Sequence, residues 1–424
     1  MINPPVSRRQ LANGITVLTI ANPSADIVSG RFFLPAGSRW EPIDRAGLAQ
    51  LLTSLLTKGT THLSALEIAD RIESVGAGLG AETTTDYLKL SLKTVKSDLV
   101  DIFKLAGEIL RTPSFPPDQI ELERKLILQA IRSQTEQPFN NAYRQLRTAL
   151  YGEHPYSRSS LGNATTMGQI TRQDLVDYHQ AHIRPDRLII SLAGRITPDE
   201  AIALVTQVFG DWEIPTVEPP TLSPTHVTTQ PQYQIEHQAT QQAIVMLGYL
   251  APAIHDPDCI ALKLIDSYLS NGMSSRLFVE LREKRGLAYD VSAFYPTRLD
   301  TSHFAVYMGT NPSNTAIAVS GLRAEVDRLC MEPLSAAELQ TAKDKLLGQY
   351  ALGKQTNGQL AQTYGWYELL GLSVDFDLEF NSAIQKLTAT QLQSAANKYL
   401  CDPYISIVSP ENKAAASKMA APIS

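Results

Sequence analysis

The chain has little cysteine, no excess of basic residues and no long apolar run, and each shortage excludes a class of protein. Its three cysteines, Cys259, Cys330 and Cys401, are far apart, so they form neither a disulfide framework nor a metal-binding spacing. The formal net charge of −6 argues against nucleic acid as the main partner, because phosphate binding needs a basic face. No apolar run approaches the ~18 residues that would span a bilayer. Residues 1–11 hold no apolar signal core, and these features together indicate a cytoplasmic protein.

The sequence divides near its middle at a segment rich in proline. Residues 213–231 are poor in large apolar side chains and are typical of extended, semi-rigid chain. At 424 residues the chain is long enough for two or more domains. We therefore expect a linker here, with its prolines at Pro215, Pro219, Pro220, Pro224 and Pro231.

The segments on either side of this linker resemble each other in order. Residues 170–175 match residues 387–392, and each segment is followed by a helical stretch, a proline and an apolar strand. Further matches upstream keep a nearly constant offset, with a drift that loop insertions would cause. We therefore predict two homologous domains, at 1–212 and 232–424, joined by the linker at 213–231.

The predicted elements of both halves indicate an α+β fold. Residues 15–20 and 27–33 have the composition of strands and precede a helix near 47–56, and residues 243–249 form the matching strand of the second half. Strands and helices come in clusters and do not strictly alternate. Each domain is therefore expected to be a largely antiparallel sheet packed against helices.

The helix near 47–56 is amphipathic. Its apolar stripe follows the i, i+3, i+4, i+7 spacing, and it consists of Leu48, Leu51, Leu52, Leu55 and Leu56. The opposite stripe holds only small polar or amide side chains, namely Gln50, Thr53, Ser54 and Thr57. Taken alone, this pattern predicts an ordinary half-buried helix with its polar residues outward.

The run from Gly47 to Thr60 resembles the zinc helix of the pitrilysin family, the inverted zincin metallopeptidases. The chain is most similar to the half-length, two-domain subfamily that contains the mitochondrial processing peptidase subunits. In that family the polar stripe is His-x-x-Glu-His, in which two histidines bind zinc and the glutamate is the general base. Here Gln50 and Ser54 stand at the histidine positions and Thr53 stands at the glutamate position.

The third zinc ligand of the family is a glutamate on a downstream helix, which corresponds here to residues 122–132. The family's register assigns this ligand position to Ala130. All four positions therefore lack the chemistry of a zinc site, because glutamine and serine are poor zinc ligands and alanine is none. The resemblance implies a pitrilysin-like, metallopeptidase-type fold without metal or other cofactor and without peptidase activity of its own.

The segment 76–83 resembles the strand that borders the substrate cleft of the family. The backbone of Gly80 and Ala81 would then pair with an extended peptide by strand addition. The alternative is a glycine-rich turn that leads into an internal strand. The sequence leaves both interpretations open.

The second half carries the most specific motif, at residues 272–289. We expect a helix that ends at Gly286, followed by a strand with Leu287 and Tyr289 on the same side as Val291. The motif resembles the family's second-domain signature, in which an arginine and a tyrosine hydrogen-bond the peptide being cut. The resemblance assigns these roles to Arg282 and Tyr289, which can both donate hydrogen bonds to an oxyanion. The alternative is an arginine that caps its helix and a tyrosine buried in the core.

His179 and His182, three residues apart near a helix end, are a weaker candidate for a metal site. No third ligand is evident in the sequence, so a structural role at the end of the helix is favoured.

Two functions fit the sequence. In the first, the chain is the accessory, substrate-binding subunit of a heterodimeric zinc peptidase, and a paralogous partner carries the intact zinc helix. In the second, it is a non-enzymatic homodimer that binds peptides or acts as a scaffold. An active enzyme with a relocated site has no ligand cluster to support it. The retained Arg282 and Tyr289 favour the accessory subunit, with an extended peptide as the ligand.

Overall fold

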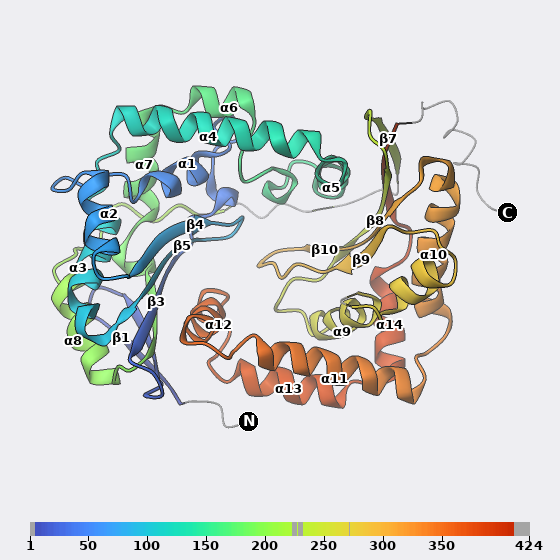
Figure 1. Ribbon diagram of the computed structural model, residues 1–424. Helices are drawn as coiled ribbons and strands as arrows, with labels where there is room; N and C mark the ends of the chain where they lie inside the picture. The colour runs from blue at the N-terminus through green and yellow to red at the C-terminus, as the bar shows by residue number, and fades with distance from the viewer. Residues whose placement is uncertain (1–4, 223–226, 228–231, 271, 411–424) are drawn as a thin grey trace. The chain divides into compact units, whose positions relative to one another are not determined.

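The computed structural model describes residues 5–222, 227, 232–270 and 272–410, which form two compact units (Figure 1). Unit 1 consists of Met1–Ile131, Ser159–Ser223 and Ala351–Phe376. Unit 2 consists of Arg132–Arg158, Pro224–Tyr350 and Asp377–Ser424. Residues 223–226 and 228–231 of the predicted linker lie outside the described residues, and residues 213–222 contain neither helix nor strand.

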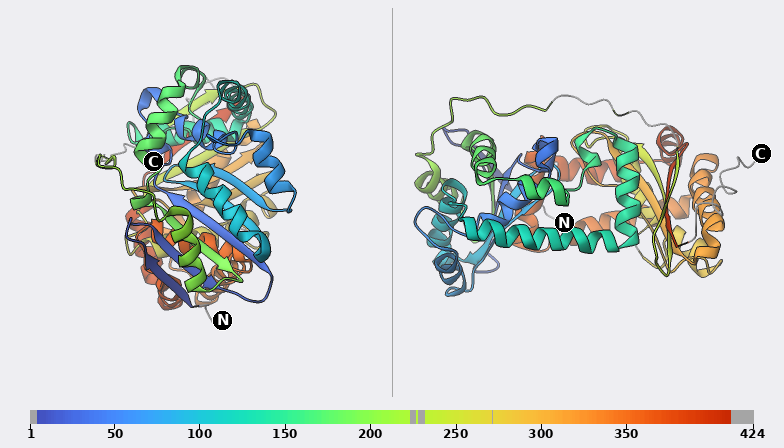
Figure 2. Two further views of the ribbon diagram at one scale, coloured as in Figure 1. Left: turned by 90° about the vertical axis from the view of Figure 1, so that its left-hand side faces the viewer. Right: turned by 90° about the horizontal axis from the view of Figure 1, so that it is seen from above.

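Unit 1 is built on a six-stranded sheet with the order β1-β2-β6-β3-β5-β4. Helices α3 and α8 pack on one face of this sheet and α12 packs on the other, as the views of Figures 1 and 2 show. Its strands are β1 (Val6–Gln10), β2 (Thr16–Ala21), β3 (Ile27–Leu34), β4 (Gly78–Thr83), β5 (Leu88–Val95) and β6 (Ile189–Gly194). Its helices are α1 (Leu48–Leu55), α2 (Ala65–Glu73), α3 (Leu99–Arg111), α4 (Pro117–Glu136, whose last turn lies in unit 2), α6 (Ala164–Gln169), α7 (Arg172–His182), α8 (Pro198–Phe209) and α12 (Asn357–Leu369).

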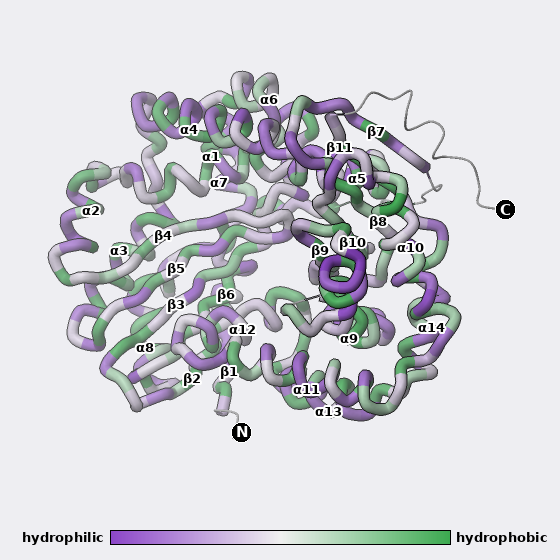
Figure 3. The backbone as a smooth tube through the Cα atoms, turned by 45° about the vertical axis from the view of Figure 1, so that its right-hand side comes forward, coloured by the Kyte–Doolittle hydropathy of each residue, from purple (hydrophilic) through white to green (hydrophobic). Residues whose placement is uncertain are grey.

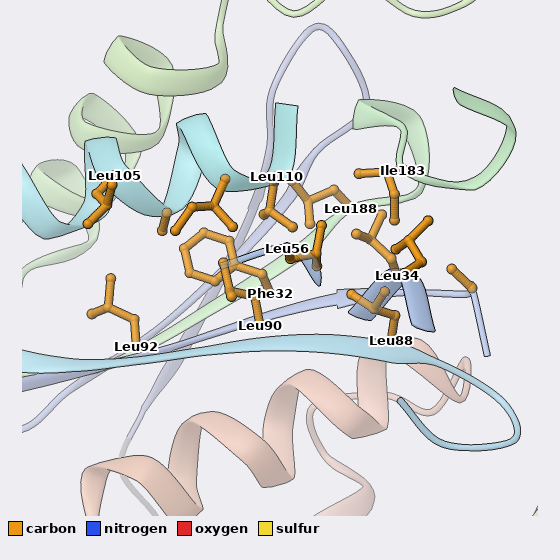
Figure 4. Close-up of a cluster of buried hydrophobic side chains, with 14 of the residues drawn as sticks. Phe32, Leu34, Leu56, Leu88, Leu90, Leu92, Leu105, Leu110, Ile183 and Leu188 are labelled. Atoms are coloured by element: carbon orange, nitrogen blue, oxygen red, sulfur yellow. The ribbon is translucent and has the colours of Figure 1, made fainter. Parts of the chain in front are cut away.

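Alternation along the strands of unit 1 produces one apolar face and one polar face. Phe32 of β3 and Leu90 of β5 lie in the core beneath the helices, together with Leu105 and Leu110 of α3 (Figure 4). The alternate positions of the same strands carry Ser29 and Arg31 in β3 and Lys89 and Lys93 in β5. Because successive side chains of a strand point to opposite faces, these polar residues lie on the face that α12 covers.

Unit 2 is built on a five-stranded sheet with the order β7-β11-β8-β10-β9. Helices α9, α10 and α14 contact this sheet, and α5 packs against its strands β8 and β11. The strands are β7 (Tyr233–His237), β8 (Ala243–Ala251), β9 (Asp290–Phe294), β10 (Ser302–Thr310) and β11 (Tyr404–Ser409). The helices are α5 (Pro138–Tyr151), α9 (Cys259–Leu269), the π-helix η6 (Phe278–Glu283), α10 (Thr315–Met331), α11 (Ala336–Leu352), α13 (Phe376–Lys386) and α14 (Ala389–Tyr399).

The two sheets share one topology. Strands β7, β11, β8, β10 and β9 take the places of β2, β6, β3, β5 and β4, and in each set the first pair is parallel and the other pairs are antiparallel. Matching helices also begin in the same way, because Thr171 and Thr388 each form a capping box at the start of α7 and α14. The predicted α+β class with largely antiparallel sheets is confirmed.

The compact units do not follow the sequence continuously, because each sheet is covered by a helix that the sequence places among the elements of the other half. Helix α12 packs against β3 and β6 of unit 1, and α5 packs against β8 and β11 of unit 2. A glycine allows the close approach in both cases. A Cβ at Gly365 of α12 would lie 2.3 Å from the ring of Phe33, and a Cβ at Gly248 of β8 would lie 2.6 Å from Leu146 of α5. The division at 1–212 and 232–424 describes the sequence repeat and stays a prediction.

We predict opposite effects for two glycine-to-alanine substitutions in helices. Gly365→Ala should lower the free energy of unfolding by about 1–3 kcal/mol, because its methyl group would overpack the contact with Phe33. Gly348→Ala in α11 should raise that free energy by up to ~1 kcal/mol, because no atom lies within 4 Å of the new methyl group and alanine is the better helix former. Denaturant unfolding measures both values. Equal effects at the two positions would contradict the close packing of α12 on β3.

Candidate functional site

Helix α1 is held in place by a buried carboxylate. The helix begins after Gly47, whose φ of 98° favours glycine. Glu41 accepts hydrogen bonds from the backbone N–H groups of Gly47, at 2.9 Å, and Ala49, at 2.7 Å. A carboxylate at this end also complements the helix dipole. Glu41 was not singled out in the sequence, since it precedes the helix by several residues and matches no usual capping pattern.

The polar side chains of α1 bond largely to one another and to the helix backbone. Gln50 and Ser54 are half-buried, and the Gln50 side-chain amide donates to the Ser54 hydroxyl at 3.4 Å, so the two residues share a face. Ser54 in turn donates to the carbonyl of Gln50 at 3.1 Å. Thr53 was expected to point outward, but it is 2% exposed and donates to the carbonyl of Ala49 at 2.6 Å. Back-bonding of this kind satisfies hydroxyl groups within a helix.

Ala130 lies exposed on α4, the helix whose alternation of hydrophilic and hydrophobic residues is visible in Figure 3. Glu123, two turns before it on nearly the same face, forms an ion pair of 3.1 Å with Lys58, which follows α1. This ion pair shows that the end of α1 lies beside α4. It lies near the face of α4 that carries Ala130. The assignment of Ala130 as the third ligand position stays a prediction.

The residues present do not fit a zinc ion. The four positions that correspond to the zinc site offer an amide, two hydroxyl groups already bonded within the helix, and a methyl group. Zinc sites in proteins use imidazole, thiolate and carboxylate ligands. Across the described part of the chain, no group of three or more His, Cys, Asp or Glu side chains is arranged to hold a metal ion. No described helix is long and apolar enough to cross a membrane.

His179 and His182 have structural contacts of their own at the end of α7. His179 is buried, and its Nε2 lies 2.8 Å from the carbonyl oxygen of Leu110. His182 packs against the rings of Tyr178 and Trp40. Burial, with smaller contributions from nearby arginines, lowers the pKa of His182 to about 4, so its imidazole is neutral near pH 7. These contacts favour the structural interpretation over a metal site.

Gly80 and Ala81 lie in an edge strand. In the described chain, β4 pairs only with β5, with Gly80 opposite Ser91 and Ala81 opposite Leu90. Helix α1 packs against the same strand. No atom lies within 4 Å of the position that a Cβ of Gly80 would take. The alternative of an internal strand is therefore wrong, and the backbone of β4 has one edge available for strand addition.

Arg282 and Tyr289 are both exposed in unit 2. Arg282 lies in the π-helix η6, with its guanidinium carbon 4.9 Å from the centre of the Phe278 ring. Tyr289 is 54% exposed, whereas Val291 is buried, so the predicted row of side chains on one side of the strand does not include Tyr289. The strand begins only at Asp290, and Tyr289 precedes it. The alternative of a core tyrosine is also wrong.

The segment that carries Arg282 and Tyr289 is anchored to α10 by a buried ion-pair network. Glu325 of α10 is 4% exposed and accepts from Arg276 Nε at 2.8 Å and from Arg285 Nη2 at 3.2 Å. The two arginines lie on either side of η6, so the pairs hold both ends of the π-helix. π-helices are rare and are frequent at functional sites. The sequence did not predict this network, because Glu325 is 40 or more residues away from both arginines.

Four substitutions should create a zinc site if the register is correct. Gln50→His, Thr53→Glu, Ser54→His and Ala130→Glu would restore two imidazoles on one helix face and a carboxylate from α4. We expect about one zinc per chain by elemental analysis, with weak affinity because the outer partners of the ligands are missing. The triple variant that keeps Ala130 is the matched control. A folded quadruple variant that binds no more zinc than the wild type would contradict the assignment.

Sequence comparison identifies relatives over most of the chain. Residues 16–164 match the family described as insulinase, peptidase family M16, and residues 169–346 match the peptidase M16 inactive domain. A protein of Mycobacterium leprae, named an uncharacterized zinc protease, is 28% identical over 408 residues, which is 94% of this chain and 90% of that protein. A Streptomyces coelicolor protein with the same description is 27% identical over 423 residues, covering 98% of this chain and 92% of the relative.

Solved structures give the same result. A Pseudomonas fluorescens structure, described as a peptidase M16 inactive domain, has a TM-score of 0.89 and 25% identity, covering 96% of this chain and 98% of that chain. A protease from Helicobacter pylori, 21% identical, has a TM-score of 0.89 and the same fold, covering 96% of this chain and all of that chain (100%). With both sheets, the α1 helix and the second-domain segment in place, the chain belongs to peptidase family M16, the pitrilysin-type metallopeptidases.

Proposed function

We propose that the chain is the accessory, substrate-binding subunit of a heterodimeric zinc peptidase. In this proposal the chain has no peptidase activity of its own and needs no cofactor. A paralogous partner supplies the zinc site, and this chain supplies Arg282 and Tyr289 as contacts to an extended peptide. The cytoplasmic location is part of the proposal, since the three cysteines are unpaired.

The observation that carries the proposal is the contrast between the two sets of family positions. At Gln50, Thr53 and Ser54 the side chains are bonded within α1 and offer no metal ligand. Arg282 and Tyr289 are instead exposed, on a segment held by the Glu325 network. A guanidinium and a phenol that reach solvent can donate hydrogen bonds to a peptide carbonyl or an oxyanion. Loss of the metal site together with retention of the donors is expected of a subunit that binds substrate for another chain.

The edge strand β4 supports peptide binding by the same chain. An extended peptide can add to the free edge of β4 through backbone hydrogen bonds, which do not depend on peptide sequence. Gly80 leaves open space where a side chain would otherwise stand. In the second candidate function, the chain binds peptides in this way as a homodimer without a catalytic partner.

Mixing the chain with a zinc-bearing paralogue should give peptidase activity that neither chain has alone. Arg282→Ala or Tyr289→Phe should then lower turnover by roughly 10²-fold, the usual effect of removing one oxyanion donor. The zinc content of the complex should not change, since neither residue is a zinc ligand in the proposal. Turnover of a fluorogenic peptide, measured with excess paralogue, gives the comparison.

Arg323→Ala is the matched control, because Arg323 is an exposed arginine of α10 that pairs with Asp327, outside the segment 272–289. Its complex should turn over like the wild type. Equal activity of wild type and both test variants would leave Arg282 and Tyr289 with a structural role only. Peptide binding by a stable homodimer, with no activity in any mixture, would favour the second function.

A further inference from the structure

Unit 1 contains a cavity of about 570 Å³ on the face of its sheet that α12 covers. Strands β3 and β5 form its floor, and the beginning of α12 forms one wall, on the side of the sheet where α12 is drawn in Figure 4. The residues that line the cavity are Asn22, Ser24, Ala25, Ile27, Ser29, Arg31, Lys89, Lys93, Gln355, Thr356, Asn357, Gly358, Gln359 and Gln362.

Three of these lining residues are cations, and none is acidic. Lys89 is buried and is already neutralised by Glu82, at 2.6 Å, while it also donates to Gln362 at 2.7 Å. Lys93, four residues further along β5, is exposed at the cavity. Glu82, which pairs with Lys89, is not part of the lining. In a chain with a net charge of −6, the three cations are a local excess of positive charge.

Arg31 brings a half-buried guanidinium to the lining of the cavity. Its Nη1 donates to the carbonyls of Gly30, at 2.8 Å, and Leu92, at 3.3 Å, and its Nε is buried without a hydrogen-bond partner among the described residues. Its Nη2 lies against the first turn of α12, only 2.9 Å from where a Cβ of Gly358 would stand. The beginning of a helix carries partial positive charge. Burial lowers the pKa of Arg31, whose only opposing influence is the attraction of Glu82.

We propose that this cavity binds a carboxylate of a peptide, supplied by an acidic side chain or by the free C-terminus. Arg31 and Lys93 would neutralise the carboxylate, with the guanidinium as a planar donor suited to its two oxygens. The polar amides of the lining, from Asn357 to Gln362, can donate further hydrogen bonds. This inference rests on the proposed function, since it gives peptide binding by this chain a preference for acidic ligands.

The test is titration calorimetry of the full chain with designed peptides. One peptide is extended and rich in aspartate and glutamate, a second has the same length with asparagine and glutamine in their place, and each is made with a free and with an amidated C-terminus. The acidic peptide should bind at least roughly 10-fold more tightly than its neutral counterpart, and higher ionic strength should weaken it. A preference that disappears on amidation identifies the C-terminal carboxylate as the source. A preference that survives identifies the side chains.

Arg31→Gln and Lys93→Gln should each weaken binding of the acidic peptide by roughly 10-fold, as expected for loss of a charge-assisted contact. Lys93 is exposed, so its variant should fold even where Arg31→Gln does not. Lys125→Gln, an exposed lysine of α4 outside the cavity, is the control with the same change of charge and should bind like the wild type.

Two results would overturn the inference. The first is equal affinity for the acidic and neutral peptides, or for wild type and Lys93→Gln. The second is binding of inorganic phosphate as tightly as the acidic peptide, because the cavity would then be a site for free anions. Neither result bears on the activity of the mixture with a paralogue. If that activity is absent while Lys93-dependent binding of the acidic peptide is present, the accessory-subunit function is wrong and the cavity assignment stands.

Discussion

The constraint on which this structure depends is that each sheet needs cover on both faces. In unit 2, α5 covers one of the two faces. The carbonyl of Ala142 in this helix accepts a hydrogen bond from the hydroxyl of Ser406 in β11, at 2.8 Å. Tyr143 and Tyr151 of the same helix lie 2.9 Å from the two ring nitrogens of His303 in β10. Because buried polar groups must find partners, these bonds fix the register of α5 on the sheet. Unit 2 therefore requires a helix encoded before the linker, and unit 1 requires α12, which is encoded after it.

Burial of apolar side chains also explains how helix α1 keeps its place without metal ligands. The five leucines of the α1 stripe are at most 3% exposed, and burial of a leucine side chain contributes about 1.5–3 kcal/mol. Glu41 fixes the beginning of the helix, and Glu123 ties α4 to its end. The position of α1 thus depends on its apolar face and its ends. Imidazole or carboxylate groups in its polar stripe are therefore not needed to hold the helix in place.

Periodicity and repeat in the sequence were sufficient to predict much of this architecture. The stripe of leucines predicted α1, and runs with the composition of strands predicted β2, β3 and β8. The exchange of α5 and α12 was not predictable in this way. The sequence of a helix shows which of its faces is buried, but it does not show against which sheet that face packs. The position of Tyr289 before β9 was not predicted either, since alternation does not show where a strand begins.

The site was predictable only where a motif fixed the residue. Arg282, Tyr289 and the positions of α1 follow from local patterns of a few residues. Glu325, Arg276 and Arg285 form their network across about 40–50 residues of sequence, and no local pattern signals such pairing. The cavity around Arg31 is indicated only weakly in the sequence, by polar residues at alternate positions of β3 and β5. Polar alternation predicts a solvated face, and only the packing of α12 turns that face into a cavity.

Without a zinc site, this member of peptidase family M16 is expected to cut no peptide by itself. The most direct test is elemental analysis of the purified chain after dialysis against a chelator, combined with a peptidase assay of the same sample. We expect no stoichiometric zinc and no cleavage. About one zinc per chain that survives the chelator, together with peptidase activity, would contradict it.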